Sequence, residues 1–206
     1  MAPRTGTRER ILKVSKSLFA ARGYEHASTS SIARQAGTSE SQLMKHFGSK
    51  AGLLEAIFSD AWSGIAERAR LASQDIRSPQ LKLQAFSGMV LAVMDSDPEL
   101  KMLMLLEGRR IRREGQMIVL TDGFMAFVQL VDGVLEEMQA AEMLKPGLTP
   151  QAVRSALMGM LEGMLRDRFL AERLGYPANF DIQQIGAMLG ITMTACVKPP
   201  ASAEAA

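Results

Sequence analysis

The sequence contains few aromatic residues, one cysteine and two histidines. These shortages limit the kind of interior, the disulfides and the catalytic or metal sites that the chain can form. Aromatic residues make up 5% of the 206 positions while methionine occurs 15 times, so we expect an adaptable interior. The single Cys196 cannot form an intrachain disulfide, and it fits a reducing compartment. The only histidines are His26 and His46, and no nucleophile, base or metal-ligand constellation can be assembled around them. We therefore expect no enzyme, no catalytic residue, no metal and no cofactor.

Long hydrophobic runs are also missing. The best candidates, residues 102–106 (MLMLL) and 187–197 (AMLGITMTACV), fall short of the ~18 apolar residues that a membrane-spanning helix needs. No basic segment followed by an apolar one opens the chain, so we expect no signal peptide. These absences predict a cytoplasmic protein without a membrane partner.

Positive charge is concentrated at one end of the chain. Residues 1–50, which we call the head, contain nine Lys or Arg and three acidic residues, a net charge of +6. Residues 51–206 contain 15 basic and 19 acidic residues, a net charge of −4. A basic head on an acidic remainder suggests that the head alone meets a polyanion such as nucleic acid.

Helical periodicity recurs along the chain, and strand signals are nearly absent. Gly23 is expected to end the first helix, and the hydroxyl side chains of Ser28 or Thr29 and of Ser39 can cap the next two. The helices predicted for this part of the chain span residues 7–22, about 28–37, 39–46 and 50–71.

The residues from 51 to 197, which we call the body, are predicted to form a helical bundle. Pro79 and Pro98 each follow a capping residue at the first position of a helix. Residues 115–143 are apolar nearly all round, which is typical of a helix at the centre of a bundle. Two further helices are predicted over residues 150–173 and about 180–197. The tail, residues 198–206, has too little apolar content to fold and is expected to be disordered.

Residues 31–47, SIARQAGTSESQLMKHF, have the pattern of a helix-turn-helix, with Gly37 in the turn. The second helix offers a core only Leu43, Met44 and Phe47. Its polar remainder is either simply solvated or touches something polar. Such a face can enter the major groove of DNA, where hydrogen-bonding side chains contact base edges.

Residues 8–58 resemble the DNA-binding domain of the TetR family of bacterial transcriptional repressors. The resemblance lies in the segments ILKVSKSLFAARGYEHAS, IARQAGTS and HFGSKAGLL. It implies an all-α protein with a helix-turn-helix DNA-binding domain over residues 1–50. It also implies a helical domain over residues 51–197 that binds an effector and forms a dimer. The implied partners are double-stranded operator DNA, a small hydrophobic effector and a second copy of the chain.

The resemblance also implies which residues contact DNA. Gln42 is the best candidate for a base contact, because its amide can form two hydrogen bonds with adenine. Lys50 is expected to contact a DNA phosphate, and so are the hydroxyl side chains at the start of the second helix. The DNA-binding residues expected in this way are Ser28, Thr29, Ser30, Glu40, Ser41, Gln42, Met44, Lys45, His46 and Lys50.

The head also departs from the family pattern. Members often have Gly-Thr-Leu-Tyr where this chain has Ser41-Gln42-Leu43-Met44, and Met44 cannot donate the hydrogen bond that the tyrosine commonly makes to the DNA backbone. We therefore expect Lys45, His46 and Lys50 to make more of the contacts with the DNA backbone. Some roles stay open. Glu40 either accepts from cytosine or complements the positive end of its helix, and His46 either contacts DNA or is merely exposed. Three arginines near the N-terminus form either an arm that contacts DNA or a solvated end of the chain. They are Arg4, Arg8 and Arg10.

Small residues recur on the last two predicted helices, where they form ridges that let helices approach closely. Helix-turn-helix proteins commonly contact paired half-sites as two-fold dimers, so these ridges predict a homodimer through residues 150–197. The alternative is that the ridges pack only within one subunit. The expected interface residues are Ala152, Ala156, Gly159, Gly163, Gly186, Gly190 and Thr194.

The body also contains apolar and scattered polar residues that could line an effector site. Methionines at helical spacing are more often core, although Met-rich walls do adapt to varied ligands. The run EGRRIRREG, residues 107–115, is interpreted as a solvated loop rather than an anion contact or an interface. The candidate ligand-binding residues are Trp62, Met102, Glu107, Thr121, Phe124, Met125, Phe127, Met160 and Arg166.

These features predict a ligand-responsive TetR-like regulator. We expect a repressor that binds palindromic operator DNA as a dimer and is released by a small hydrophobic effector. The alternative is a helical dimer that senses a ligand or a protein through the body and has a degenerate head that does not contact DNA. The missing tyrosine and glycine in the third helix keep this alternative open.

Overall fold

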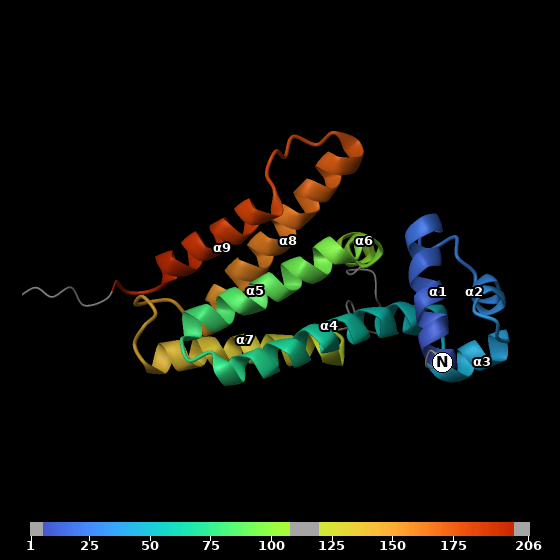
Figure 1. Cartoon of the computed structure of the whole chain (residues 1–206), viewed down its shortest axis with the longest axis horizontal. Helices are drawn as coiled ribbons and strands as arrows, with labels where there is room; N and C mark the ends of the chain where they lie inside the picture. The colour runs from blue at the N-terminus through green and yellow to red at the C-terminus, as the bar shows by residue number, and fades with distance from the viewer. Residues whose placement is uncertain (1–5, 108–119, 200–206) are drawn as a thin grey trace, which may run out of the picture. The chain divides into compact units, whose positions relative to one another are not determined.

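The computed structural model describes residues 6–107 and 120–199, and all regular secondary structure in these ranges is helical (Figure 1). The predicted all-α class is therefore confirmed. The helices are α1 (Thr7–Arg22), α2 (Thr29–Gln35), α3 (Glu40–Phe47), α4 (Lys50–Asp75), α5 (Pro79–Ser96), α6 (Pro98–Glu107), α7 (Asp122–Ala140), α8 (Pro150–Leu174) and α9 (Ile182–Cys196).

The starts and ends of the short helices follow from local chemistry. The hydroxyl of Ser28 accepts a hydrogen bond from the Ser31 backbone N–H at 3.2 Å, and Ser39 does the same for Gln42 at 3.2 Å. These N-caps satisfy backbone donors that have no partner within the helix. Gly23 ends α1 with a φ of +81°, a conformation that side chains disfavour.

The centre of the chain differs from the prediction of one helix over residues 115–143. Residues 115–119, among them Met117 and Ile118, lie outside the described ranges. Leu120 and Thr121 are not helical, and α7 begins only at Asp122. The Thr121 hydroxyl accepts from the Phe124 backbone N–H at 3.3 Å and caps the helix, which leaves Leu120 58% exposed. At the other end α7 stops at Ala140. The prediction was wrong at these ends because apolar periodicity does not register a cap.

The chain divides into two compact units, and each is described by itself. The first unit comprises Met1–Gly64 and Val93–Ala126, and the second comprises Ile65–Ala92 and Phe127–Ala206. The boundary predicted at residue 50 falls inside the first unit. Of the run EGRRIRREG, Glu107 lies in the first unit, and the other residues lie outside the described ranges.

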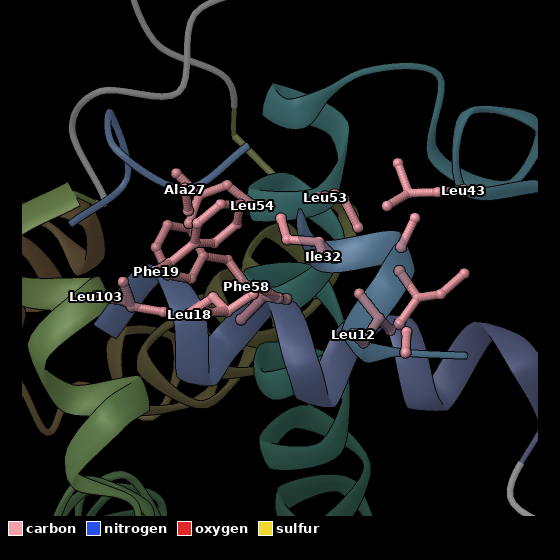
Figure 2. Close-up of a cluster of buried hydrophobic side chains, with 14 of the residues drawn as sticks. Leu12, Leu18, Phe19, Ala27, Ile32, Leu43, Leu53, Leu54, Phe58 and Leu103 are labelled. Carbon is pink, nitrogen blue, oxygen red and sulfur yellow. The ribbon is translucent and has the colours of Figure 1, made fainter. Parts of the chain in front are cut away.

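The first unit is built on one hydrophobic cluster that draws on α1, α2, α3, α4 and α6 (Figure 2). Leu43 is the residue of α3 that is fully buried in it, and Ile32 fills the same role for α2. Leu100 and Leu103 come from α6, far along the chain, and are 5% and 1% exposed. The head therefore shares its core with helices that follow it in sequence.

The second unit has its own apolar interior. Phe86 of α5 and Phe127 of α7 lie with ring centroids 6.4 Å apart, and both are nearly fully buried. An ion pair joins Asp132 of α7 to Arg154 of α8. Helices α8 and α9 lie side by side, as Figure 1 shows.

The end of α9 is tied to the loop between α7 and α8. The Lys145 N–H donates to the Cys196 carbonyl at 2.9 Å, and the Lys198 N–H donates to the Met143 carbonyl at 2.8 Å. Lys198, the first residue of the predicted disordered tail, is therefore held by a backbone hydrogen bond. Residues 200–206 lie outside the described ranges.

Candidate nucleic-acid interface

The helix-turn-helix has a buried side and an exposed side. Leu43 and Ile32 are both 0% exposed and anchor α3 and α2 to the core of the first unit. Eight of the ten predicted DNA-binding residues are exposed, and two, Thr29 and Lys50, are half-buried. We call the exposed eight the recognition face: Ser28, Ser30, Glu40, Ser41, Gln42, Met44, Lys45 and His46.

A hydrogen bond connects the starts of α2 and α3. The Thr29 hydroxyl donates to a carboxylate oxygen of Glu40. The hydroxyl oxygens of Ser28 and Ser30 lie 3.2 Å apart beside this pair. Four predicted DNA-binding residues from two helices therefore form one polar group. Sequence spacing did not predict the contact between Thr29 and Glu40.

Lys50 is held at the start of α4 by two contacts. Its Nζ donates to the Glu25 carbonyl at 3.0 Å and lies 4.4 Å from the centroid of the Tyr24 ring. Burial raises the pKa of Tyr24, and the charges of Glu25 and Glu107 raise it further. Tyr24 thus presents a neutral ring to the ammonium group, which is a favourable cation–π arrangement.

Two arginines of the predicted terminal group have structural partners instead. Both terminal nitrogens of Arg8 donate to the Asp60 carboxylate, at 3.0 and 3.1 Å, and the guanidinium lies 5.7 Å from the centroid of the Phe47 ring. This hydrogen bonding to Asp60 raises the pKa of Arg8. Arg10 Nε donates to the Ala36 carbonyl at 3.4 Å.

Arg8 and Arg10 are exposed, but both have hydrogen-bond partners within the first unit. They brace α1 against α4 and against the turn of the helix-turn-helix. Sequence reasoning missed these roles because Asp60 lies 52 positions from Arg8 and no local pattern indicates the pair. Arg4 lies outside the described residues.

The candidate ligand-binding residues fall in both compact units. In the first unit, Trp62 and Phe124 form an edge-to-face pair with centroids 5.1 Å apart, and Thr121 caps α7 beside them. The first unit also holds Met102, Glu107 and Met125. In the second unit lie Phe127, packed on Phe86, Met160, whose sulfur accepts from the Thr192 hydroxyl at 3.5 Å, and Arg166, 3.7 Å from Asp167.

The candidate dimer residues are mostly uncovered on α8 and α9. Five are exposed: Ala152, Ala156, Gly159, Gly190 and Thr194. Gly163 and Gly186 are half-buried, and a Cβ on Gly186 would lie 3.9 Å from a methyl group of Leu91 in its own chain. Gly186 thus faces α5 within the subunit. The exposed side of α9 also carries Met188 and Ile191, 42% and 62% exposed.

The described part of the chain lacks two features. No cluster of three His, Cys, Asp or Glu that could hold a metal ion occurs there. None of the helices in those ranges is both long and apolar enough to cross a membrane.

Comparison with known proteins identifies the head. Residues 11–57 match the family model described as "Bacterial regulatory proteins, tetR family". The head of the chain is a tetR-family domain. The resemblance inferred from the sequence is confirmed, and the family that it matches consists of regulatory proteins rather than enzymes.

Similarity to individual proteins extends over most of the chain. The nucleoid occlusion factor SlmA of Photobacterium profundum is 24% identical over 192 residues, which cover 91% of this chain and 97% of SlmA. The fatty acid metabolism regulator protein of Bacillus subtilis is 22% identical over 152 residues, 74% of this chain and 78% of its own length.

A solved structure agrees with these sequence relatives. The structure of the transcriptional regulator FadR from Bacillus subtilis in complex with stearoyl-CoA matches with a TM-score of 0.78 at 19% identity. The match covers 92% of this chain and 98% of that one. At this identity the likeness shows a shared fold along nearly the whole chain.

Proposed function

We propose that the protein is a ligand-responsive transcriptional regulator, and specifically a repressor, that binds palindromic operator DNA as a homodimer and is released by a small hydrophobic effector. The main support for the DNA-binding part of this proposal is the recognition face. Gln42, Lys45 and His46 project from a helix whose Leu43 is completely buried. A helix anchored from beneath with polar side chains on its outer side has the arrangement that major-groove contact requires.

Lys50 supports the same proposal. Lys50 lies at the start of α4, next to the end of α3, and its ammonium group has further N–H donors for a phosphate besides the one given to Glu25. Such phosphate contacts set the position of a protein on DNA, while base contacts set its sequence preference. The charge distribution agrees, because the head carries a net +6.

The dimer half rests on the uncovered apolar side of α8 and α9. Large side chains such as Ile191 stand exposed there beside small residues such as Gly190, which gives a surface suited to close helix contact. A second copy of the chain would cover this surface, and a two-fold pair would present two heads to the half-sites of a palindrome.

The effector half rests on composition and on the relatives. The body is rich in methionine and poor in aromatic residues, a combination that accommodates flexible apolar ligands. The FadR structure was determined with stearoyl-CoA, so we propose a fatty acyl thioester as the effector class to test first. The alternative, a sensing dimer with a degenerate head, has less support. The third helix has its N-cap, Ser39, its buried anchor, Leu43, and an exposed polar face.

The test begins with DNA selected by the full-length protein from random-sequence duplexes and measured by gel shift. Replacing Lys50 by Ala should weaken binding to all sequences alike and lower the slope of log K against log salt by about one. Replacing Gln42 by Ala should relax preference at one position of each half-site, at ~1–3 kcal/mol. A uniform loss in both variants would contradict this division of roles.

Release is tested by adding stearoyl-CoA to the protein–DNA complex, with free coenzyme A as the control. The thioester should raise the melting temperature of the protein and lower its affinity for the selected duplex. The coupling should be ~1–3 kcal/mol, the usual range for an effector. Stabilisation without any change in DNA affinity would refute the sensing half and leave the DNA-binding half intact.

A further inference from the structure

The recognition face contains one acidic residue, which is unexpected on a surface that meets phosphates. Glu40 is the only Asp or Glu between Ser28 and Lys50. It is exposed at the first position of α3. Among the described residues, no lysine or arginine forms an ion pair with it. Its hydrogen-bond partner is instead the Thr29 hydroxyl, which donates to the carboxylate.

That partner is itself a candidate phosphate contact. A threonine hydroxyl has one proton to donate, so Thr29 cannot donate to Glu40 and to a DNA phosphate at the same time. The carboxylate of Glu40 occupies the position of an anion at this hydroxyl. An arriving phosphate must displace it, and two negative charges competing for one donor repel each other.

We infer that Glu40 is a specificity-determining residue, because its carboxylate opposes phosphate binding at Thr29 unless a base supplies a new hydrogen-bond donor. Cytosine offers such a donor in the major groove through its N4 amino group, and carboxylates accept from it. A cognate sequence can therefore redirect Glu40 and free Thr29 for the backbone. Other sequences leave the carboxylate beside a phosphate without compensation. This inference rests on the proposed DNA-binding function.

The central experiment compares Glu40→Gln with the wild-type protein on two DNAs: the duplex selected by the wild type and a pool of random-sequence duplexes. Glutamine keeps the length of the side chain and an acceptor for Thr29, but removes the charge. We expect affinity for the random pool to rise roughly tenfold, as expected when like-charge repulsion is relieved. The slope of log K against log salt should steepen by about one. Affinity for the selected duplex should rise less, so the ratio between the two DNAs falls.

Glu25→Gln is the matched control. It makes the same change of charge in the head, at an exposed residue in the turn before α2. It should shift affinity for both DNAs equally and leave their ratio unchanged. Thr29→Val provides the second arm, because it removes the hydroxyl. In that background Glu40→Gln should have a smaller effect than in the wild type, as a double-mutant cycle would measure.

The outcomes distinguish a failure of the role inferred for Glu40 from a failure of the proposed DNA-binding function. An unchanged ratio for Glu40→Gln overturns the inference, as does an equal loss of affinity on both DNAs, which would mean that Glu40 only holds α2 and α3 together. Thermal unfolding of each variant verifies that the fold is retained. If the wild-type protein selects no duplex from the random pool, the proposed DNA-binding function itself is refuted, an outcome distinct from an unchanged ratio for Glu40→Gln.

Discussion

At the scale of single residues, two glycines of α4 show how differently the same residue can be constrained. A Cβ on Gly52 would lie 2.0 Å from the Phe47 carbonyl oxygen, whereas a Cβ on Gly64 would meet nothing within 4 Å. The Gly52 N–H also donates to the Ser49 hydroxyl at 2.9 Å, which closes the junction between α3 and α4. The missing side chain at Gly52 is therefore what lets α3 end directly against α4.

Replacing Gly52 by Ala should lower the free energy of unfolding by ~1–3 kcal/mol, because the added methyl cannot avoid a backbone atom without shifting a helix. DNA affinity should fall with it. Replacing Gly64 by Ala is the control in the same helix and should stabilise by ~0.5–1 kcal/mol through higher helix propensity. Urea unfolding of both variants is the measurement. Equal stability of the two would show that the junction yields easily.

Sequence reasoning succeeded at this scale where the chemistry is local. The caps at Ser28 and Ser39 and the positive φ of Gly23 follow from residue type and immediate neighbours. It failed where the partner is remote, as for Arg8 and Asp60, because a folded contact between distant positions leaves no periodic trace in one sequence.

At the scale of elements, α6 is attached to α1 by polar contacts as well as by leucines. Lys16 forms an ion pair with Asp97, and the Ser17 hydroxyl donates to the Glu99 carboxylate at 3.0 Å. Asp97 has a second task, because its other carboxylate oxygen accepts from the Leu100 N–H at 2.9 Å and caps α6. One side chain therefore starts a helix and fixes it to the head.

The two tasks of Asp97 can be separated by substitution. Asp97→Asn should keep the cap and lose most of the ion pair, at a cost below ~1 kcal/mol, since both side chains are partly exposed. Asp97→Ala should lose both and cost about 1 kcal/mol more, the usual value of an N-cap. Chemical denaturation of the two variants and of Lys16→Met measures the difference. Identical losses for Asn and Ala would mean that the cap contributes nothing.

The elements themselves were largely predictable. The first three helices, both proline-started helices and the last two emerged from hydrophobic spacing and capping residues. The ends of α7 did not, because the Thr121 cap interrupts a segment whose apolar pattern continues through it. The candidate DNA-binding residues were named from the resemblance and are exposed or half-buried, as a DNA contact requires, and the contact itself stays a prediction. The ligand-facing residues remain a prediction, since apolar periodicity alone does not separate a cavity wall from a core.

At the scale of the whole molecule, the proposed dimer gives a direct prediction. Ile191→Glu places a charge at the centre of the uncovered side of α9 and should yield monomers in sedimentation, because burying an unpaired carboxylate is costly. Binding to palindromic DNA should weaken together with dimerisation. Leu81→Glu is the control, since Leu81 is similarly exposed, at 55%, and belongs to a different helix, α5. An unchanged mass for Ile191→Glu would place the interface elsewhere.

The α6 leucines in the core of the first unit also affect how the protein is made. During synthesis, the head and the first turns of α4 appear well before Leu100 and Leu103. The interval between Phe58 and Leu100 is about 40 residues, or roughly 2–8 s at ordinary elongation rates. For that time the nascent head carries an apolar surface that only later sequence can cover. A ribosome stalled within α5 would therefore present an incomplete DNA-binding domain, open to chaperones and proteases until α6 is available to close it.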